Sequence, residues 1–242
     1  MSQLRLVLTA VQFLTRVPVP AWVGHSPDQL NHATRYFPLV GVAVGALGAG
    51  VFWAASQGLP PLAAATLSIV ATVLATGAFH EDGLADTCDG LFGGWTRDDA
   101  LRIMKDSRLG TFGVAGLALT LATKAALLHD PWAMIAAGAG SRFMAVTLIA
   151  ALPYVRESEQ GARAKPVAAG VGVAELAIAG ACGLVPLLLL ARPILSLVLI
   201  AVLTAGLARW FRRRLGGYTG DTLGATQQVT ELAVLAVAAW QG

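Results

Sequence analysis

The sequence predicts an all-α membrane protein, a polytopic bundle of about six to seven transmembrane helices. Of its 242 residues, 56% are hydrophobic and only 13% are charged, whereas an ordinary soluble domain carries about 25% charged residues. The apolar residues are also gathered into runs of about 20, the length that a helix needs to cross a bilayer. Since no run suggests a soluble domain, residues 1–242 are expected to form a single integral membrane domain.

The segments before the first long apolar run are not expected to span. Residues 3–15 are apolar but too short, and Arg5 and Gln12 make them partly polar, so we expect an interfacial or re-entrant helix. Pro18 and Pro20 then end any helix. Residues 21–35 are polar and are expected to form a loop with about one helical turn.

The long apolar runs follow in order and are rich in Gly and Ala, which lets membrane helices pack closely within or between subunits. A last segment, residues 226–240, is shorter and fits a tilted span, a half-span or an interfacial helix. The six expected spans are residues 36–57, 62–79, 109–128, 132–152, 167–190 and 193–210.

Lys and Arg residues are distributed unequally between the two sides of such a bundle. The N-terminus, residues 80–108, residues 153–166 and the cluster at 209–214 fall on one side, while the opposite connections contain only Arg192. The positive-inside rule makes the Lys- and Arg-rich side cytoplasmic. The polar, glycine-punctuated segments all share this face, which favours one active site there.

Residues 80–94, HEDGLADTCDGLFGG, form the most distinctive stretch. On a helix, Asp82, Asp86 and Asp89 fall at i, i+4 and i+7 and share one face. Like charges at this spacing destabilise a helix unless a partner offsets them. Mg²⁺ would do so and would leave room for substrate phosphates. A solvated acidic loop between two helices is the structural alternative.

Three charged residues interrupt the apolar runs: Lys124, Arg142 and Glu175. Charges at this depth are costly and usually face the bundle interior or mark function. We expect Arg142 to be functional, because it can reach a phosphate or an acid within the bundle. Lys124, near the predicted outer end, is expected to snorkel to the surface. For Glu175, an interfacial turn and a functional role stay equally open.

Further candidates for phosphate binding lie in the polar segments. The turn at residues 110–113 and the loop GGYTGD, with Gly217 and Gly220, offer backbone amides that make anion-binding concavities. Lys105 and Arg108 flank Asp106 and are candidates for stabilising phosphate charge. Ordinary helix-boundary turns and helix-end cations are the structural alternatives.

Clustered carboxylates at a membrane face suit three classes of protein. Phosphoryl transfer and prenyl transfer both use Asp-bound metal ions to hold a phosphate or diphosphate, whereas an ion-coupled transporter places acids along a conduction path. Here the acids gather at one end of a span beside glycine loops. This pattern favours an enzyme with a diphosphate-containing substrate.

Five segments, taken together and in this order, closely resemble the cobalamin synthase family, the adenosylcobinamide-GDP ribazoletransferases. The resemblance extends from about residue 11 to residue 231, and the segments are FLTRVPVP, YFPLVGVAVG, HEDGLADTCDGLFGG, IMKDSRLGTFG and GGYTGDTLGA. It implies an enzyme of the bacterial inner membrane that joins adenosylcobinamide-GDP to α-ribazole or α-ribazole 5′-phosphate with Mg²⁺. GMP is released, and adenosylcobalamin or its 5′-phosphate forms.

In such a reaction Asp82, Asp86 and Asp89 would hold Mg²⁺, and Glu81 would be a further ligand or a general base. His80 would take the proton of the ribazole hydroxyl, with helix capping as its structural alternative. Asp106 and Asp221 are the next acids on this face, and either would complete a second metal site. The expected partners are the two substrates and the lipid bilayer, without nucleic acid; a second copy of the chain and other enzymes of cobalamin assembly stay open.

The acid spacing also loosely resembles the CDP-alcohol phosphotransferases, which displace a nucleoside monophosphate from a diphosphate. The chain lacks their DxxDG opening with the later GxxxDxxxD half. This family therefore stays an alternative, together with a prenyltransferase-like membrane enzyme.

Overall fold

The computed structural model describes residues 1–155 and 171–240, and within them the protein is a bundle of α-helices. Two short 3₁₀ helices, Ala21–Val23 and Thr34–Tyr36, flank α2, and an isolated bridge joins Tyr154 to Tyr218. The α-helices are α1 (Gln3–Leu14), α2 (Pro27–Ala33), α3 (Phe37–Ser56), α4 (Pro61–Thr76), α5 (Phe79–Gly93), α6 (Arg97–Ile103), α7 (Thr111–Leu127), α8 (Pro131–Ala151), α9 (Val173–Leu188), α10 (Pro193–Arg214) and α11 (Gly220–Ala239).

The helices have the length and composition of a membrane bundle, which confirms the predicted fold class. Three helical segments are long and apolar enough to cross a membrane: Pro27–Ser56, Pro131–Ala151 and Pro193–Arg214. The bent pair α4–α5 qualifies as a fourth if it is one span, while α1, α7 and α9 are apolar but shorter. The crossing of the membrane six or seven times stays a prediction. Residues 156–170, which belong to the expected loop 153–166 and span 167–190, lie outside the described residues.

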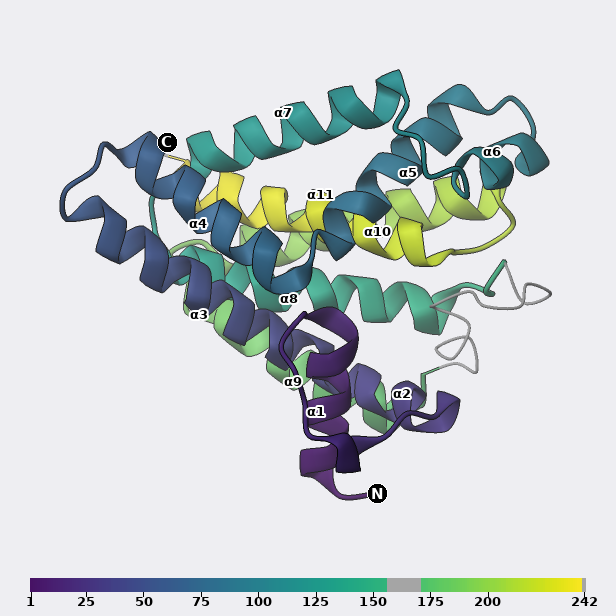
Figure 1. Ribbon diagram of the computed structural model, residues 1–242, viewed down its shortest axis with the longest axis horizontal. Coiled ribbons are helices and arrows are strands. Elements are labelled where there is room, and N and C mark those ends of the chain that lie inside the picture. The colour runs from purple at the N-terminus through teal and green to yellow at the C-terminus, as the bar shows by residue number, and fades with distance from the viewer. Residues whose placement is uncertain (156–170, 241–242) are drawn as a thin grey trace.

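Helix α8 is the centre of the bundle and packs against α3, α9, α10 and α11 (Figure 1). Its crossing with α3 is close because glycines meet there. A Cβ atom at Gly41 would lie only 2.1 Å from the carbonyl oxygen of Gly138. This close approach of small residues is typical of helices that associate in a bilayer.

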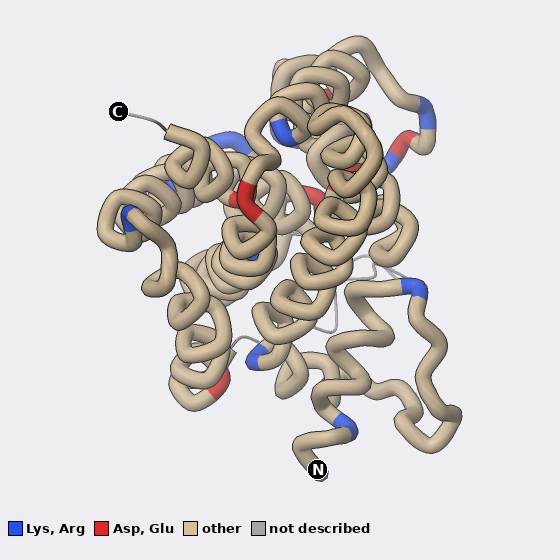
Figure 2. The backbone as a smooth tube through the Cα atoms, turned by 90° about the vertical axis from the view of Figure 1, so that its left-hand side faces the viewer, with Lys and Arg blue, Asp and Glu red and all other residues tan. Residues whose placement is uncertain are grey.

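The polar connections gather at one end of the bundle. The end of α5, all of α6, the start of α7 and the α10–α11 loop lie together on the right of Figure 1. Arg97 donates to the carbonyl of Leu215 at 2.8 Å, and Arg214 donates to the carbonyl of Gly94 at 2.7 Å. Away from these connections, long stretches of helix carry neither acidic nor basic residues (Figure 2).

Two segments differ from the sequence-based expectation. Residues 21–35 contain a true helix, α2, because Ser26 accepts a hydrogen bond from the Gln29 amide and Pro27 starts the first turn. The last helix begins at Gly220, well before residue 226, because Thr219 and Thr222 form a reciprocal capping box. The polar loop GGYTGD therefore provides the start of α11.

The junction between α4 and α5 bends the chain by 91°. Gly77 and Ala78 both have positive φ, 66° and 57°, and Ala78 is the non-glycine residue with this conformation in the described chain. The segment after α1 supports the bend, since the Arg16 amide donates to the carbonyl of Ala75 at 2.7 Å. The bend directs α5 toward α11 and the polar end.

Ala78→Gly should stabilise the protein by about 1 kcal/mol, because it removes the clash of a Cβ atom in the left-handed region. Thermal unfolding in detergent measures this as a higher midpoint. Ala71→Gly in the interior of α4 is the matched control and should lower stability by about 0.5–1 kcal/mol. A similar loss of stability in both variants would contradict the proposed strain at Ala78.

Candidate functional site

Helix α5 carries the acidic motif and presents its three aspartates in different surroundings. Asp82 is exposed, Asp86 is half-buried and Asp89 is buried. The motif is thus helical, as its spacing predicts, and Asp82 and Asp86 lie one turn apart on the accessible part of the helix. These two carboxylates are the accessible acids of the motif.

Asp89 caps the N-terminus of α7. Its Oδ2 accepts a hydrogen bond from the Gly110 amide at 2.7 Å, and its Oδ1 accepts one from the Gly113 amide at 2.8 Å. These are amides that a helix leaves without partners in its first turn, and the positive end of the helix dipole favours the carboxylate. The turn at residues 110–113 therefore binds an anion, as its glycines suggest, and that anion is Asp89.

Asp89→Asn should destabilise the protein by about 1–3 kcal/mol, because the amide group of Asn can accept only one of the two backbone hydrogen bonds. Thermal unfolding in detergent measures the change. Asp130, which accepts one bond from the Trp132 amide at the start of α8, is the matched control. Since Asn is as good an N-cap as Asp, Asp130→Asn should have little effect; equal effects would argue against the double cap at Asp89.

The first turn of α11 lies directly against the first turns of α5. A Cβ atom at Gly83 would lie 2.8 Å from the carbonyl oxygen of Asp221, and one at Gly224 would lie 3.1 Å from that of His80. Only glycine allows this approach. As a result, Gly220 and Asp221 at the positive end of the α11 dipole lie beside the turn of α5 that carries Asp82.

The predicted residues of the α6–α7 connection lie along the second half of α5. Lys105 and Arg108 are both exposed there. The side chain and amide of Arg108 donate hydrogen bonds to Asp106 and lower the pKa of this carboxyl group to about 2. These bonds hold the loop between α6 and α7, and the catalytic role of Asp106 stays a prediction.

Gly217 packs against the chain instead of lining an open cradle. It is buried, and a Cβ atom there would lie 2.0 Å from the carbonyl oxygen of Pro153. The amide of Tyr218 donates to the same oxygen at 2.9 Å. Of the two glycines predicted to bind phosphate, Gly220 is therefore the one beside the acids.

Among the described residues, no three His, Cys, Asp or Glu side chains converge to hold a metal ion. Asp82 and Asp86 nevertheless fit the way in which Mg²⁺ is commonly bound, through one or two carboxylates together with substrate phosphates. Binding of Mg²⁺ by Asp82, Asp86 and Asp89 stays a prediction. In the structure, the carboxylate of Asp89 accepts hydrogen bonds from two backbone amides.

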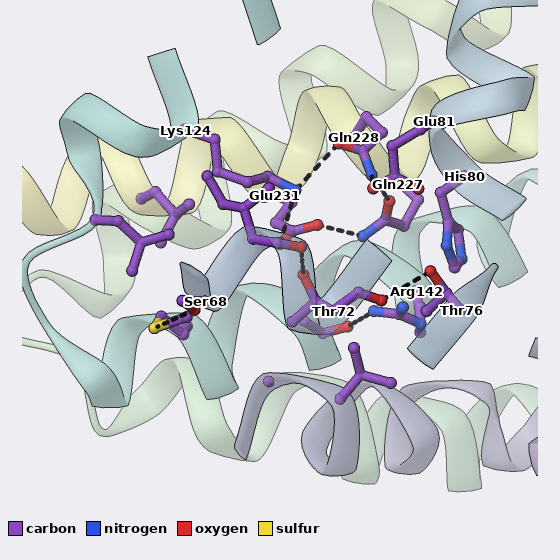
Figure 3. Close-up of a pocket in the computed structure, with 17 residues that line it drawn as sticks. Ser68, Thr72, Thr76, His80, Glu81, Lys124, Arg142, Gln227, Gln228 and Glu231 are labelled. Atoms are coloured by element: carbon purple, nitrogen blue, oxygen red, sulfur yellow. Dashed lines mark hydrogen bonds and ion pairs between the residues drawn. The ribbon is translucent and has the colours of Figure 1, made fainter. Parts of the chain in front are cut away.

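The inner side of α5 opens on a polar cavity (Figure 3). His80 and Glu81 reach it from α5, Arg142 from α8 and Lys124 from α7. Helix α11 contributes Gln227, Gln228 and Glu231. The predicted catalytic residues His80, Glu81 and Arg142 are thus brought together, but within the bundle, behind the accessible aspartates.

Hydrogen bonds connect most of these side chains. Gln228 donates to Glu81 at 3.0 Å and to Gln227 at 2.9 Å, while Gln227 donates to Ser141 at 3.1 Å. Lys124 donates to Gln228 at 3.1 Å and pairs with Glu231 at 3.2 Å. The network therefore joins α5, α7, α8 and α11 through polar contacts.

Two atoms of this cavity are buried without a hydrogen-bond partner among the described residues: Oε2 of Glu81 and Nε of Arg142. Both side chains are more than nine-tenths buried, at 8% and 4% exposed. Arg142 does bond through Nη1, which donates to the carbonyl of Gly138 at 3.0 Å. Unsatisfied buried groups of this kind are costly, and they indicate a place for a polar ligand or water.

Sequence reasoning missed the α11 residues of this network. Gln227, Gln228 and Glu231 are polar positions within the otherwise apolar segment 226–240, and their spacing is that of one helix face. This spacing can be seen in the sequence, but the prediction for residues 226–240 addresses only whether the segment crosses the membrane. The snorkelling expected of Lys124 is wrong, because its side chain is buried and faces Glu231.

Glu175 lies in the first turn of α9, where its carboxylate forms ion pairs with Arg35 and His32, the latter at 2.8 Å. This placement at a helix end agrees with the interfacial-turn interpretation. It connects α9 to the segment between α2 and α3.

The chain matches the family model described as cobalamin-5-phosphate synthase over residues 6–239. It is 48% identical to a protein of Leptothrix cholodnii, over 95% of this chain and 92% of that one, named adenosylcobinamide-GDP ribazoletransferase. Proteins of the same name from Shewanella sp. strain ANA-3 and Shewanella frigidimarina are 49% and 46% identical, over 96% and 98% of this chain and 92% and 96% of theirs. No solved structure matches this chain. The match over nearly its whole length shows that the chain belongs to the cobalamin-5-phosphate synthase family.

Proposed function

We propose that this protein is an adenosylcobinamide-GDP ribazoletransferase, which joins adenosylcobinamide-GDP to α-ribazole or α-ribazole 5′-phosphate and releases GMP. The observation that carries the proposal is the match of residues 6–239 to this family, with relatives of that name nearly half identical. The pair Asp82 and Asp86, on a helix that contacts the first turn of α11 at Gly83, supports it, since a diphosphate needs both cations and amides.

Asp82 and Asp86 are the proposed ligands of Mg²⁺, and oxygens of the substrate diphosphate would complete its coordination. When bound, Mg²⁺ neutralises charge on the diphosphate and on GMP as it leaves. The amides at Gly220 and Asp221 favour the same anionic group through the positive end of α11. Lys105 and Arg108, exposed on the neighbouring connection, attract the negatively charged nucleotide.

In the proposed step, the ribazole hydroxyl oxygen forms a bond to the phosphorus that carries the corrinoid side chain. The bond from that phosphorus to the GMP oxygen breaks, and GMP leaves with the electron pair. The hydroxyl proton is proposed to pass to His80, which is buried and faces the polar cavity of the bundle. Glu81 and Arg142 hold the polar cavity around His80 and are proposed to orient it.

The enzyme is proposed to lie in the bacterial inner membrane with the polar end of the bundle in the cytoplasm. The connections around α6 and the end of α10 carry most of the described loop cations: Arg97, Arg102, Lys105, Arg108, Arg212, Arg213 and Arg214. This excess of positive charge at one end supports the orientation through the positive-inside rule.

A nucleotide-release assay tests the proposal. The purified protein with Mg²⁺, adenosylcobinamide-GDP and α-ribazole 5′-phosphate should release one GMP for each adenosylcobalamin 5′-phosphate formed. Absence of GMP release with this pair, together with CMP release from CDP-diacylglycerol and an alcohol, would overturn it in favour of a CDP-alcohol phosphotransferase. Ion flux in proteoliposomes without any nucleotide turnover would instead indicate a transporter.

A further inference from the structure

A second, apolar cavity shares His80 and Arg142 with the polar one. Its walls come from five helices, α1, α3, α5, α8 and α11. Among the described residues that line it, the polar side chains are His80 and Arg142, and the others are Phe13, Leu14, Phe37, Phe79, Ala145, Ile149, Gly220, Leu223 and Gly224.

Aromatic rings form one wall of this cavity. Phe13 stacks on Phe37 with ring centroids 5.5 Å apart, and Phe79 meets the edge of Phe13 at the same distance. The ring of His80 in turn packs nearly perpendicular to Phe79, at 5.4 Å. Such a set of rings offers flat surfaces and edges to another aromatic ring.

The cavity adjoins the acidic site. Gly220 and Gly224 of its wall belong to the turn of α11 that contacts α5 at Gly83, next to Asp82. Gly220 is also the first residue of α11, whose positive end is the proposed binding site of the diphosphate.

We infer that the apolar cavity binds the aromatic base of the ribazole substrate and selects among bases by size and polarity. This inference rests on the proposed function. The base of ribazole is a flat, methylated bicyclic ring with one unsubstituted ring nitrogen, so aromatic walls with one polar corner at His80 and Arg142 match its chemistry. The attached ribose then carries its hydroxyl toward Asp82 and Asp86.

The other parts of the substrates fit this cavity less well. A corrin ring with its peripheral amides is several times larger than a bicyclic base, and its amides would be left without partners by the apolar lining. Guanine carries several donors and acceptors, which the apolar wall would leave without partners at a cost of about 1–3 kcal/mol each. For the same reason the cavity should discriminate against purine bases in favour of benzimidazoles.

Ala145→Leu tests the inference, because it adds bulk to the cavity wall. With adenosylcobinamide-GDP saturating, the KM for dimethylbenzimidazole riboside should rise at least about tenfold, a change of 1.4 kcal/mol. The KM for unsubstituted benzimidazole riboside should rise less, and the KM for adenosylcobinamide-GDP should not change. Ala201→Leu, on the exposed face of α10, adds the same atoms elsewhere and should leave all three values unchanged.

Leu223→Ala enlarges the cavity and gives the opposite test, independent of whether Ala145→Leu folds. It should raise the relative kcat/KM for a tricyclic naphthimidazole riboside over dimethylbenzimidazole riboside. Equal changes for all bases in both variants, or a change confined to the KM for adenosylcobinamide-GDP, would overturn the inference while the function stands. A wild-type protein that neither turns over α-ribazole nor binds it in equilibrium dialysis would refute the function itself.

Discussion

Replacing Asp82 or Asp86 with Asn should lower the rate of GMP release by on the order of 10²–10³-fold, while the protein still inserts and unfolds as the parent does. Asp82 is exposed and Asp86 is half-buried on α5, and the turn of α5 that carries Asp82 contacts the first turn of α11 at Gly83. Removing one carboxylate weakens the proposed Mg²⁺ site, which would stabilise the negative charge that develops on the leaving GMP. Loss of a single group that stabilises such charge typically lowers the rate by this factor.

Asp98→Asn is the control for this experiment, since Asp98 is an exposed acid at the same end of the bundle whose side chain is 91% accessible. Its activity should equal that of the parent. Titration with Mg²⁺ provides a second measurement: the concentration needed for half-maximal activity should rise in both site variants and not in the control. Full activity of Asp82→Asn and Asp86→Asn at saturating Mg²⁺ would refute the metal-site assignment.

The helices were predictable because their signals are local. Apolar runs near 20 residues place α3, α4, α7, α8 and α10 within a few residues of where they lie. The helical spacing of Asp82, Asp86 and Asp89 is also a local property, and α5 has it. The sequence thus yields the fold class and the helix that carries the candidate site.

The partners of individual charges were not predictable, because they depend on which helices meet. Spacing alone makes Asp89 equivalent to Asp82, yet it caps α7, a helix that begins more than 20 residues later. The sequence does not distinguish Asp106 from the other acids of this face, but in the structure Arg108 donates a hydrogen bond to it. The sequence predicts that Lys124 is a helix-end cation, but in the structure it forms an ion pair with Glu231 of α11. In each case a tertiary contact decides the role.

The 91° bend between α4 and α5 is a further feature that the length of the apolar run does not predict. The expected span 62–79 continues through Gly77 and Ala78, but their positive φ values turn the chain there. A glycine followed by alanine is compatible with a continuous membrane helix, so the composition of this segment does not predict the bend. The bend matters for function because it sets α5 against α11 and leaves Asp82 exposed and Asp86 half-buried.

Lys124→Met should destabilise the protein by about 3–5 kcal/mol, because it leaves the carboxylate of Glu231 in the bundle interior without its cation. Lys124 also donates to Gln228, which in turn donates to Glu81. The loss should therefore reach the polar cavity as well. Unfolding in mixed detergent micelles measures the change in the free energy of unfolding, and Arg102→Met, which breaks the exposed pair with Asp99, should cost less than about 1 kcal/mol.

The double variant Lys124→Met/Glu231→Gln separates the charge from the packing. If the unpaired carboxylate causes the loss, replacing it with a neutral amide should recover most of the stability, since removing both charges of a buried pair is often nearly neutral. The amide oxygen introduced by Glu231→Gln would keep an acceptor for Gln227, which donates to Glu231 at 2.5 Å in the parent. A double variant as unstable as Lys124→Met would show instead that Lys124 stabilises the bundle through its bond to Gln228 and the helices that this network joins.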